Sequence, residues 1–454
     1  MAIILPANTL AAGGYTVDNS CRFNGDAYLH KTVGTPTNAD KYTLSVWIKR
    51  SILTSFGPDN AQYIMSYDGG GNPREHIRFN DSTDTLNWYF RDSGGTATNL
   101  TTTQEFRDVS AWYHFVFVYD SGQAVAANRQ TIYCNGAEIT SFSSSGYVAQ
   151  NTDSNLNSNV SVKIGAIGTG SPSVYSSQYL SEVVFLDGQT LAASNFGEYD
   201  EDSPTIWKPK DVSTLTFGDN GFYLDFEDSA NLGNDANGGT DWTEVGLAAT
   251  DQATDTPTNN FCTMSPIASL DSPVMSEGNC YMTNDGGSEH AVSTFAASSG
   301  RWYFEVKVTV QNSANALVAG ISDVYMSQKE LAEAWLGNDA GQYGYVGYDG
   351  KIYTADDGGT AYGDVITTND ILGVYVDLED NKLYFAKNGT VQNSGTGHTI
   401  TAAASTTGGA YQFVTGDWFT STSNVDYGVN FGGCPAFAIS SGNADANGYG
   451  NFEY

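Results

Sequence analysis

Trp112-Tyr-His-Phe-Val-Phe-Val-Tyr119 decides the fold class of this 454-residue chain. The run is apolar on both faces, so it must be covered on both sides, as in the middle of a sandwich. Tyr42-Thr-Leu-Ser-Val-Trp-Ile-Lys-Arg50 instead alternates apolar with polar side chains, which predicts a half-buried strand. Together the two runs predict a β-sandwich.

The rest of the chain repeats this pattern. Asn135-Gly136 and Asn388-Gly389 each separate two short apolar runs and predict hairpin turns. Residues 301–309 alternate as a half-buried strand does, and only residues 327–336 predict a helix. We therefore predict an all-β fold of two antiparallel β-sandwich (jelly-roll) domains joined by a structured connector.

The predicted layout has four parts. An apolar N-terminal arm covers 1–14, the first jelly roll 15–203, the connector 204–271 and the second sandwich 272–454. The connector is predicted to be ordered because it carries Trp207, Phe222, Tyr223 and Trp242, which need burial.

Composition restricts the partners. The chain has 19 Lys and Arg against 51 Asp and Glu, a formal net charge of −32. Phosphate backbones and anionic lipids repel such a surface, so nucleic acid is excluded as a partner. No stretch is long and apolar enough for membrane insertion, and the N-terminus has no signal-peptide pattern. The five Cys stand far apart without a Cys-x-x-Cys motif, so no zinc or redox site is predicted.

The residues up to about Asp202 resemble a laminin G-like, concanavalin A-like jelly roll. The resemblance rests on five blocks in the expected order: Cys21-Arg-Phe-Asn-Gly25, Thr43-Leu-Ser-Val-Trp-Ile48, Trp112–Tyr119, Ile132-Tyr-Cys-Asn-Gly136 and Tyr179-Leu-Ser-Glu-Val-Val-Phe-Leu-Asp-Gly188.

Residues from about Arg301 to Phe431 resemble a SPRY domain. The matching blocks are Gly300-Arg-Trp-Tyr-Phe-Glu-Val306, Ala319-Gly-Ile-Ser322, Tyr343-Gly-Tyr-Val-Gly347, Asp370-Ile-Leu-Gly-Val-Tyr-Val-Asp377 and Lys382-Leu-Tyr-Phe-Ala-Lys-Asn-Gly389. The joining stretch is similar to one in phage structural proteins that carry both modules. This resemblance implies a bacteriophage virion protein, a tail fibre, a spike or a head decoration.

The residues do not predict an enzyme. Glycoside hydrolysis needs two carboxylates facing each other across the sugar, and Glu198-Tyr-Asp-Glu-Asp202 has its carboxylates in the wrong register beside a turn. None of the five His has a neighbouring Ser or Cys in a nucleophile motif.

Binding candidates come from aromatic and amide groups, which stack on sugars and bind their hydroxyls. In the first domain these are Trp88, Tyr89 and Arg91, with a core position as the alternative for Trp88. In the second they are Trp335, Tyr343, Tyr362 and Trp418, in or near predicted loops. No cofactor is required, but Asp68 and Asp92 are candidate ligands for Ca²⁺, a cation that prefers carboxylate oxygens.

The sequence thus predicts a non-enzymatic, homo-oligomeric protein of the virion surface, made in the host cytoplasm. Its expected partners are other virion proteins and host cell-surface glycan. The alternatives are a purely architectural capsid decoration protein and a polysaccharide depolymerase. A secreted bacterial adhesin fits less well, because the expected signal peptide is missing.

Overall fold

The computed structural model describes residues 14–53, 61–269, 273–283, 289–311, 317–325, 335–355, 357–418 and 425–454. They divide into two compact units, which we call the N-terminal unit, ending at Asn260, and the C-terminal unit, Phe261–Tyr454. Both are antiparallel β-sandwiches, so the predicted all-β fold class is confirmed. The predicted arm, except Gly14, and most of the predicted helix at 327–336 lie outside the described residues.

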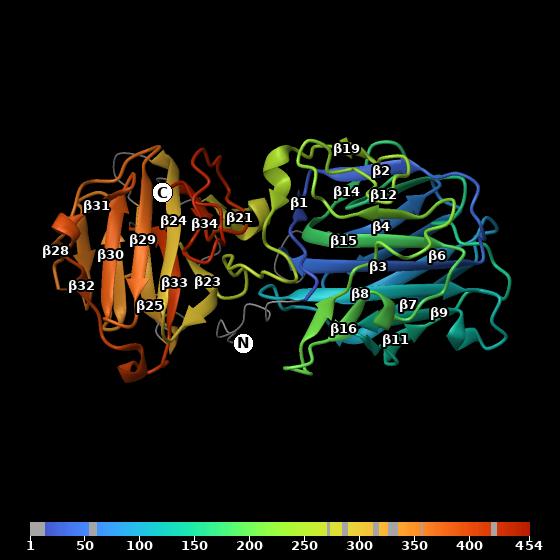
Figure 1. Cartoon of the computed structure of the whole chain (residues 1–454), viewed down its shortest axis with the longest axis horizontal. Coiled ribbons are helices and arrows are strands. Elements are labelled where there is room, and N and C mark those ends of the chain that lie inside the picture. Colours follow the sequence, from blue (N-terminus) through green and yellow to red (C-terminus); the bar gives the residue numbers. More distant parts are fainter. Residues whose placement is uncertain are drawn as a thin grey trace. The chain divides into compact units, whose positions relative to one another are not determined.

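The N-terminal unit consists of two eight-stranded sheets, and β15, β3 and β8 of the first sheet lie side by side in Figure 1. The first sheet contains, in spatial order, β10 (Ala137–Glu138), β9 (Gln130–Cys134), β8 (Trp112–Asp120), β3 (Lys41–Arg50), β15 (Ser177–Asp187), β1 (Ser20–Asn24) and β20 (Gln252–Ala253), with β18 (Phe222–Leu224) paired to β15. The second sheet contains β11 (Phe142–Ser145), β7 (Ala97–Glu105), β6 (Thr85–Arg91), β5 (Arg74–Phe79), β4 (Gln62–Asp68), β12 (Ser161–Ile164), β2 (Tyr28–Thr32) and β19 (Thr243–Val245). Two small ladders complete the unit, β13 (Ala166–Ile167) with β14 (Val174–Tyr175) and β16 (Gly197–Tyr199) with β17 (Trp207–Pro209).

Strand β8 is covered on both faces, as its sequence predicts. Phe115 and Phe117 join the main core between the two sheets. Val116 packs on the opposite side, in a second cluster that includes Phe196 and Phe217. Because alternate side chains of a strand point to opposite faces, both halves of the apolar run are used.

The stretch predicted as a connector, 204–271, is divided between the units. Strands β18, β19 and β20 extend the two sheets of the N-terminal unit, where Phe222 and Trp242 are buried in its main core. A buried ion pair of 2.6 Å joins Lys49 Nζ on β3 to Asp255. Large aromatic side chains that need burial therefore draw residues up to Asn260 into the first sandwich, and the remainder belongs to the C-terminal unit.

The C-terminal unit has two sheets, and β30, β29 and β24 lie side by side in Figure 1. The third sheet of the chain contains β21 (Val274–Ser276), β22 (Tyr281–Thr283), β34 (Val425–Asn430), β24 (Arg301–Gln311), β29 (Ile371–Asp377), β30 (Lys382–Lys387) and β31 (Thr390–Val391), with β32 (His398–Thr399) paired to β30. The fourth contains β23 (His290–Ala297), β33 (Tyr411–Asp417), β25 (Leu317–Asp323), β26 (Gln342–Val346), β27 (Lys351–Tyr353) and β28 (Thr360–Ala361). The helices with described bounds are single 3-10 turns, at Ala126–Asn128, Ala193–Asn195, Ala249–Asp251, Glu277–Asn279, Asn393–Gly395 and Ala403–Ser405.

Candidate functional site

One Ser–His pair in the N-terminal unit has the spacing of a catalytic pair. Its histidine, however, carries its proton on the nitrogen that faces the serine, where a general base would have none. Ser45 Oγ lies 2.8 Å from His114 Nε2, and the Trp207 indole N–H donates to His114 Nδ1 over 2.9 Å. An indole nitrogen only donates, so Nδ1 is the acceptor and the neutral ring carries its proton on Nε2. Burial lowers the pKa of His114 to about 3. His114 therefore donates to Ser45 and does not accept its proton.

The outer face of the second sheet carries most of the cationic side chains of that sheet. Arg74, His76 and Arg78 alternate along β5 with side chains that point into the sandwich. Register pairs place Arg91 opposite Arg74 and Tyr89 opposite His76. Lys163 on β12 shares this face, because it pairs with Ser66, which pairs with His76. We call Arg74, His76, Arg78, Arg91 and Lys163 the basic face.

The two predicted Ca²⁺ ligands, Asp68 and Asp92, each have partners within the chain. Both Asp68 oxygens bind the Arg74 guanidinium, at 2.8 Å and 3.2 Å. Asp92 Oδ1 accepts the Thr96 N–H at 2.8 Å and stabilises a turn. In the described part of the chain, no group of three or more His, Cys, Asp or Glu is placed to hold a metal. Asp68 is thus held by a guanidinium and Asp92 by a backbone amide, and Ca²⁺ binding stays a prediction.

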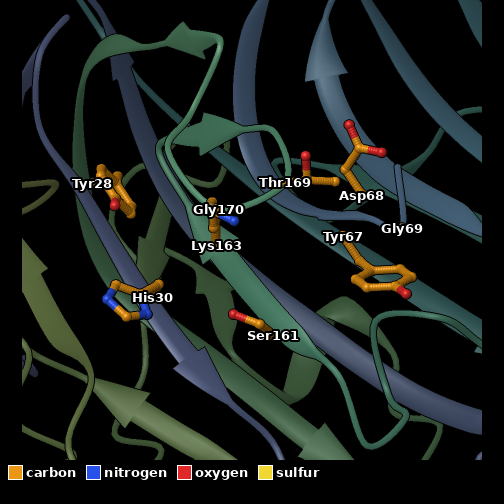
Figure 2. A pocket seen from close by; sticks show the side chains of 9 residues that line it. All are labelled: Tyr28, His30, Tyr67, Asp68, Gly69, Ser161, Lys163, Thr169 and Gly170. Carbon is orange, nitrogen blue, oxygen red and sulfur yellow. The ribbon is translucent and has the colours of Figure 1, made fainter. Parts of the chain in front are cut away.

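A pocket of about 420 Å³ lies beside Lys163, on the basic-face side of the second sheet (Figure 2). Tyr28 and His30 of β2 form one side, and Asp68 and Thr169 lie across from them. Lys163 Nζ donates to Gly168 O at 2.7 Å, which directs its ammonium towards the loop that closes the pocket. The remaining lining residues are Tyr67, Gly69, Ser161 and Gly170.

An aromatic cluster lies on the outer face of the fourth sheet. Trp335 and Trp418 have ring centroids 3.9 Å apart, and Tyr353 lies 5.4 Å and 4.5 Å from them. The three side chains cover a layer of buried side chains: Ala268, Val292, Val318, Leu336, Val346 and Val414. Both Trp side chains are half-buried, so the aromatic cluster offers part of its surface to a partner.

Polar groups border this aromatic cluster. The Tyr353 hydroxyl donates to Asp349 Oδ2 over 2.8 Å, and Lys351 Nζ lies 3.5 Å from the same carboxylate. Burial, followed by the hydrogen bond to Asp349, raises the pKa of Tyr353, which keeps the hydroxyl protonated. Tyr348 is 47% exposed beside Asp349.

Three predicted binding residues lie in the cores instead. The Trp88 indole donates to the buried Glu75 carboxylate over 3.1 Å, inside the first sandwich. Tyr343 and Tyr362 are buried in the core of the second sandwich. Side-chain alternation separates the two faces of a strand but does not say which face is covered, so the sequence leaves both a core and a surface position open for these aromatics.

His76, Arg78 and Tyr353 were not predicted as binding residues from the sequence. A signal existed for the first two, because Arg74-Glu-His-Ile-Arg-Phe79 places positively charged or titratable side chains at alternate positions. Tyr353 had no local signal, since Trp335 and Trp418 come from distant parts of the chain.

Two family models match the chain. Residues 23–173 match a model described as the concanavalin A-like lectin/glucanases superfamily, and residues 301–415 match the SPRY domain. The first match covers strands of both sheets of the N-terminal unit, and the second begins at β24 and ends in β33.

Several curated proteins are similar over shorter stretches. Ran-binding protein 9 of Xenopus tropicalis is 31% identical over 113 residues, which is 25% of this chain and 20% of that protein. Human Ran-binding protein 9 is 32% identical over 105 residues, 23% of this chain and 14% of that protein. The chain thus spans a fifth or less of the length of these relatives.

Solved structures resemble single units at low identity. The SPRY domain of human HERC1 has a TM-score of 0.27 and 15% identity, covering 35% of this chain and 89% of that one. A putative carbohydrate binding protein from Bacteroides ovatus has a TM-score of 0.34 and 18% identity, covering 51% of this chain and 59% of that one.

The expectation of a phage virion surface protein is wrong. The curated relatives are Ran-binding proteins of animals, which overturns both that function and the expected place on a virion. The capsid-decoration and depolymerase alternatives gain no support from these relatives. The motif blocks that suggested a virion protein correspond to strands and hairpins of a β-sandwich. A β-sandwich fold does not determine where a protein acts. The chain contains a laminin G-like, concanavalin A-like domain over residues 23–173 and a SPRY domain over residues 301–415.

Proposed function

We propose that this chain is a non-enzymatic protein-interaction scaffold whose C-terminal unit binds a protein partner through the aromatic cluster of Trp335, Tyr353 and Trp418. One observation carries the proposal: three large aromatic side chains are packed together on an outer sheet face, and two of them, Trp335 and Trp418, remain part-exposed. The SPRY match and the Ran-binding relatives support protein–protein interaction in general.

The aromatic cluster has the properties of an interface anchor. Trp and Tyr are enriched among residues that carry most of the binding energy, since each gives a large contact area with few rotatable bonds. The Tyr353 hydroxyl is held by Asp349, and the indoles rest on buried valines. The rings are therefore ordered before binding, which reduces the entropy lost on association.

The surroundings favour a basic partner segment. The chain as a whole carries a formal charge of −32, although Lys351 offsets the charge of Asp349 at the edge of the aromatic cluster. A negative field speeds the approach of a positive partner. Indole faces also attract Arg and Lys side chains. We therefore expect a segment with Arg or Lys next to an apolar side chain.

Two structural features support a role without catalysis. The proton of the Ser45–His114 pair points the wrong way for general-base chemistry. Glu75 is occupied by five donors inside the core, from Tyr42, Trp88, Ser154, Asn155 and Leu156.

The proposal is tested by selecting peptides from a random library on the full-length chain and measuring their affinity for variants. We expect the selected peptides to carry Arg or Lys beside an apolar residue. We expect Trp418→Ala to lower their affinity for the chain about tenfold or more. Tyr449→Ala removes another exposed aromatic of the same unit and serves as the matched control. Equal losses in both variants, or none in Trp418→Ala, would contradict the proposed surface.

A further inference from the structure

The basic face holds positive charges that the fold itself does not neutralise. Asp68 pairs with Arg74, but Arg78 and Arg91 form no ion pair with any described residue. The chain has only 19 Lys and Arg against 51 acidic residues, so two unpaired guanidinium groups on one sheet face are unusual for its composition. Like charges on directly opposed positions, such as Arg74 and Arg91, oppose strand pairing.

Each of the two unpaired guanidinium groups is held by a hydrogen bond and still has N–H donors available for a ligand. Arg78 Nη1 donates to the Tyr63 hydroxyl at 3.0 Å, and its guanidinium carbon lies 5.6 Å from the centre of that ring. Arg91 Nε donates to Gly95 O at 3.3 Å. A guanidinium has five N–H donors, so each arginine keeps enough of them to bind a carboxylate in the bidentate manner.

His76 is a second, independent sign of a ligand. Its side chain lies between Arg74 and Arg78 on β5, only 4% exposed, and neither ring nitrogen hydrogen-bonds any described residue. The ring stacks on Tyr89 at 4.9 Å between centroids and meets the edge of Tyr63 at 5.3 Å. Burial, and then the charges of Arg78 and Arg74, lower its pKa, so the ring is neutral and offers one donor and one acceptor.

Strand geometry sets the distance between the two arginines. Residues 74 and 78 lie four positions apart on β5, roughly 13 Å at the usual rise of a strand. Arg91 lies opposite Arg74 on the neighbouring strand. With the strand spacing of about 4.8 Å added across the sheet, Arg78 and Arg91 lie about 14 Å apart, which is close to side chains four positions apart in an extended chain that runs obliquely over the two strands, with His76 between them.

We propose that the basic face of the N-terminal unit binds an extended, acidic segment of a partner protein, with carboxylates at positions i and i+4 on Arg78 and Arg91. His76 lies between them, with its ring packed against Tyr63 and Tyr89. Complementary charge identifies the occupant: planar guanidinium groups match carboxylates, and their spacing matches a strand-like chain. This partner differs from the basic segment proposed for the C-terminal unit, so the two surfaces are independent.

The test uses the full-length chain and a fluorescein-labelled peptide. The probe is a nine-residue peptide of Ser and Thr with Glu at its third and seventh positions, and anisotropy is followed at low salt. We expect Arg78→Gln and Arg91→Gln each to weaken binding about tenfold, as for hydrogen bonds between charged groups. Arg301→Gln makes the same charge change at an exposed ion pair of the C-terminal unit and should leave the affinity unchanged.

Changes in the probe give a test that does not depend on variant folding. A peptide with Gln in place of both Glu should not bind, and one with Glu at the third and fifth positions should bind more weakly. Equal affinities for these peptides, or for wild type and both Arg variants, would overturn the proposal. Binding of polygalacturonate but not of the peptide would overturn it in favour of an acidic saccharide. Trp418→Ala should leave the affinity for the acidic peptide unchanged, because Trp418 lies in the C-terminal unit. The test of the basic face therefore does not depend on whether the aromatic cluster binds a partner.

Discussion

At the scale of single residues, several buried acids are satisfied by hydrogen bonds but remain costly to ionise. Glu182 lies at a bulge in β15 with a φ of 49° and accepts hydrogen bonds from Tyr15 and Tyr223. Burial raises the pKa of Glu182 to about 7, and the nearby Asp225 and Glu227 charges add to the effect. The two hydroxyls reduce this cost without removing it.

The position of Glu182 predicts a pH-dependent effect on stability. The folded pKa lies above the unfolded value of about 4.3, so the folded state holds the proton more tightly. The penalty is absent below about pH 4, grows between pH 4 and 7, and reaches about 4 kcal/mol above pH 7. We expect Glu182→Gln to raise the free energy of unfolding, relative to wild type, more at pH 8 than at pH 5. Urea unfolding at both pH values measures this, and a pH-independent difference would contradict it.

At the scale of elements, alternation predicted the strands closely. Strands β3 and β8 differ from the runs read in the sequence by one residue at one end, and β24 begins at the predicted residue 301 and continues two residues past 309. Pairing between strands was not predictable in this way, because it joins residues far apart in the chain. The sequence therefore predicted Tyr89 and Arg91 as binding residues but not His76, which the register places opposite Tyr89, or Arg78, which lies opposite Asn87 on the same face.

The contact between β3 and the segment after β20 depends on the buried Lys49–Asp255 ion pair. Asp255 also accepts the Trp112 indole N–H over 2.9 Å, and both charged side chains are 1% exposed. Removing one partner of a buried pair leaves an uncompensated charge, so we expect Asp255→Ala to destabilise the N-terminal unit by about 3–5 kcal/mol. The control is Lys210→Gln, which breaks an exposed pair with Glu198 and should cost under about 1 kcal/mol. Thermal and urea unfolding measure both, and similar losses would contradict a structural role for the buried pair.

At the scale of the whole molecule, the C-terminal boundary of the N-terminal unit differs from the boundary predicted from the sequence. The family match ends at residue 173, and turn-rich composition suggested a connector from residue 204. The structure instead places β18, β19 and β20 in the sheets of the N-terminal unit. Composition describes a loop-rich stretch correctly but does not say which sheet edge its short strands complete.

The boundary at Asn260 can be tested with two fragments of the chain, one ending at residue 260 and one at residue 203. Residues 14–260 keep both complete sheets, the Lys49–Asp255 pair and the buried Phe222 and Trp242, so we expect them to fold alone with a cooperative thermal transition. Residues 14–203 lack all of these. Losing a buried Phe or Trp side chain costs about 3–5 kcal/mol each, so two such losses approach the whole stability of a typical domain. We expect the shorter fragment to show no cooperative melt and poorly dispersed amide NMR signals. If it melts as cooperatively as the longer one, then residues 204–260 are an appendage to the sandwich, and the boundary read from the sequence is the physical one.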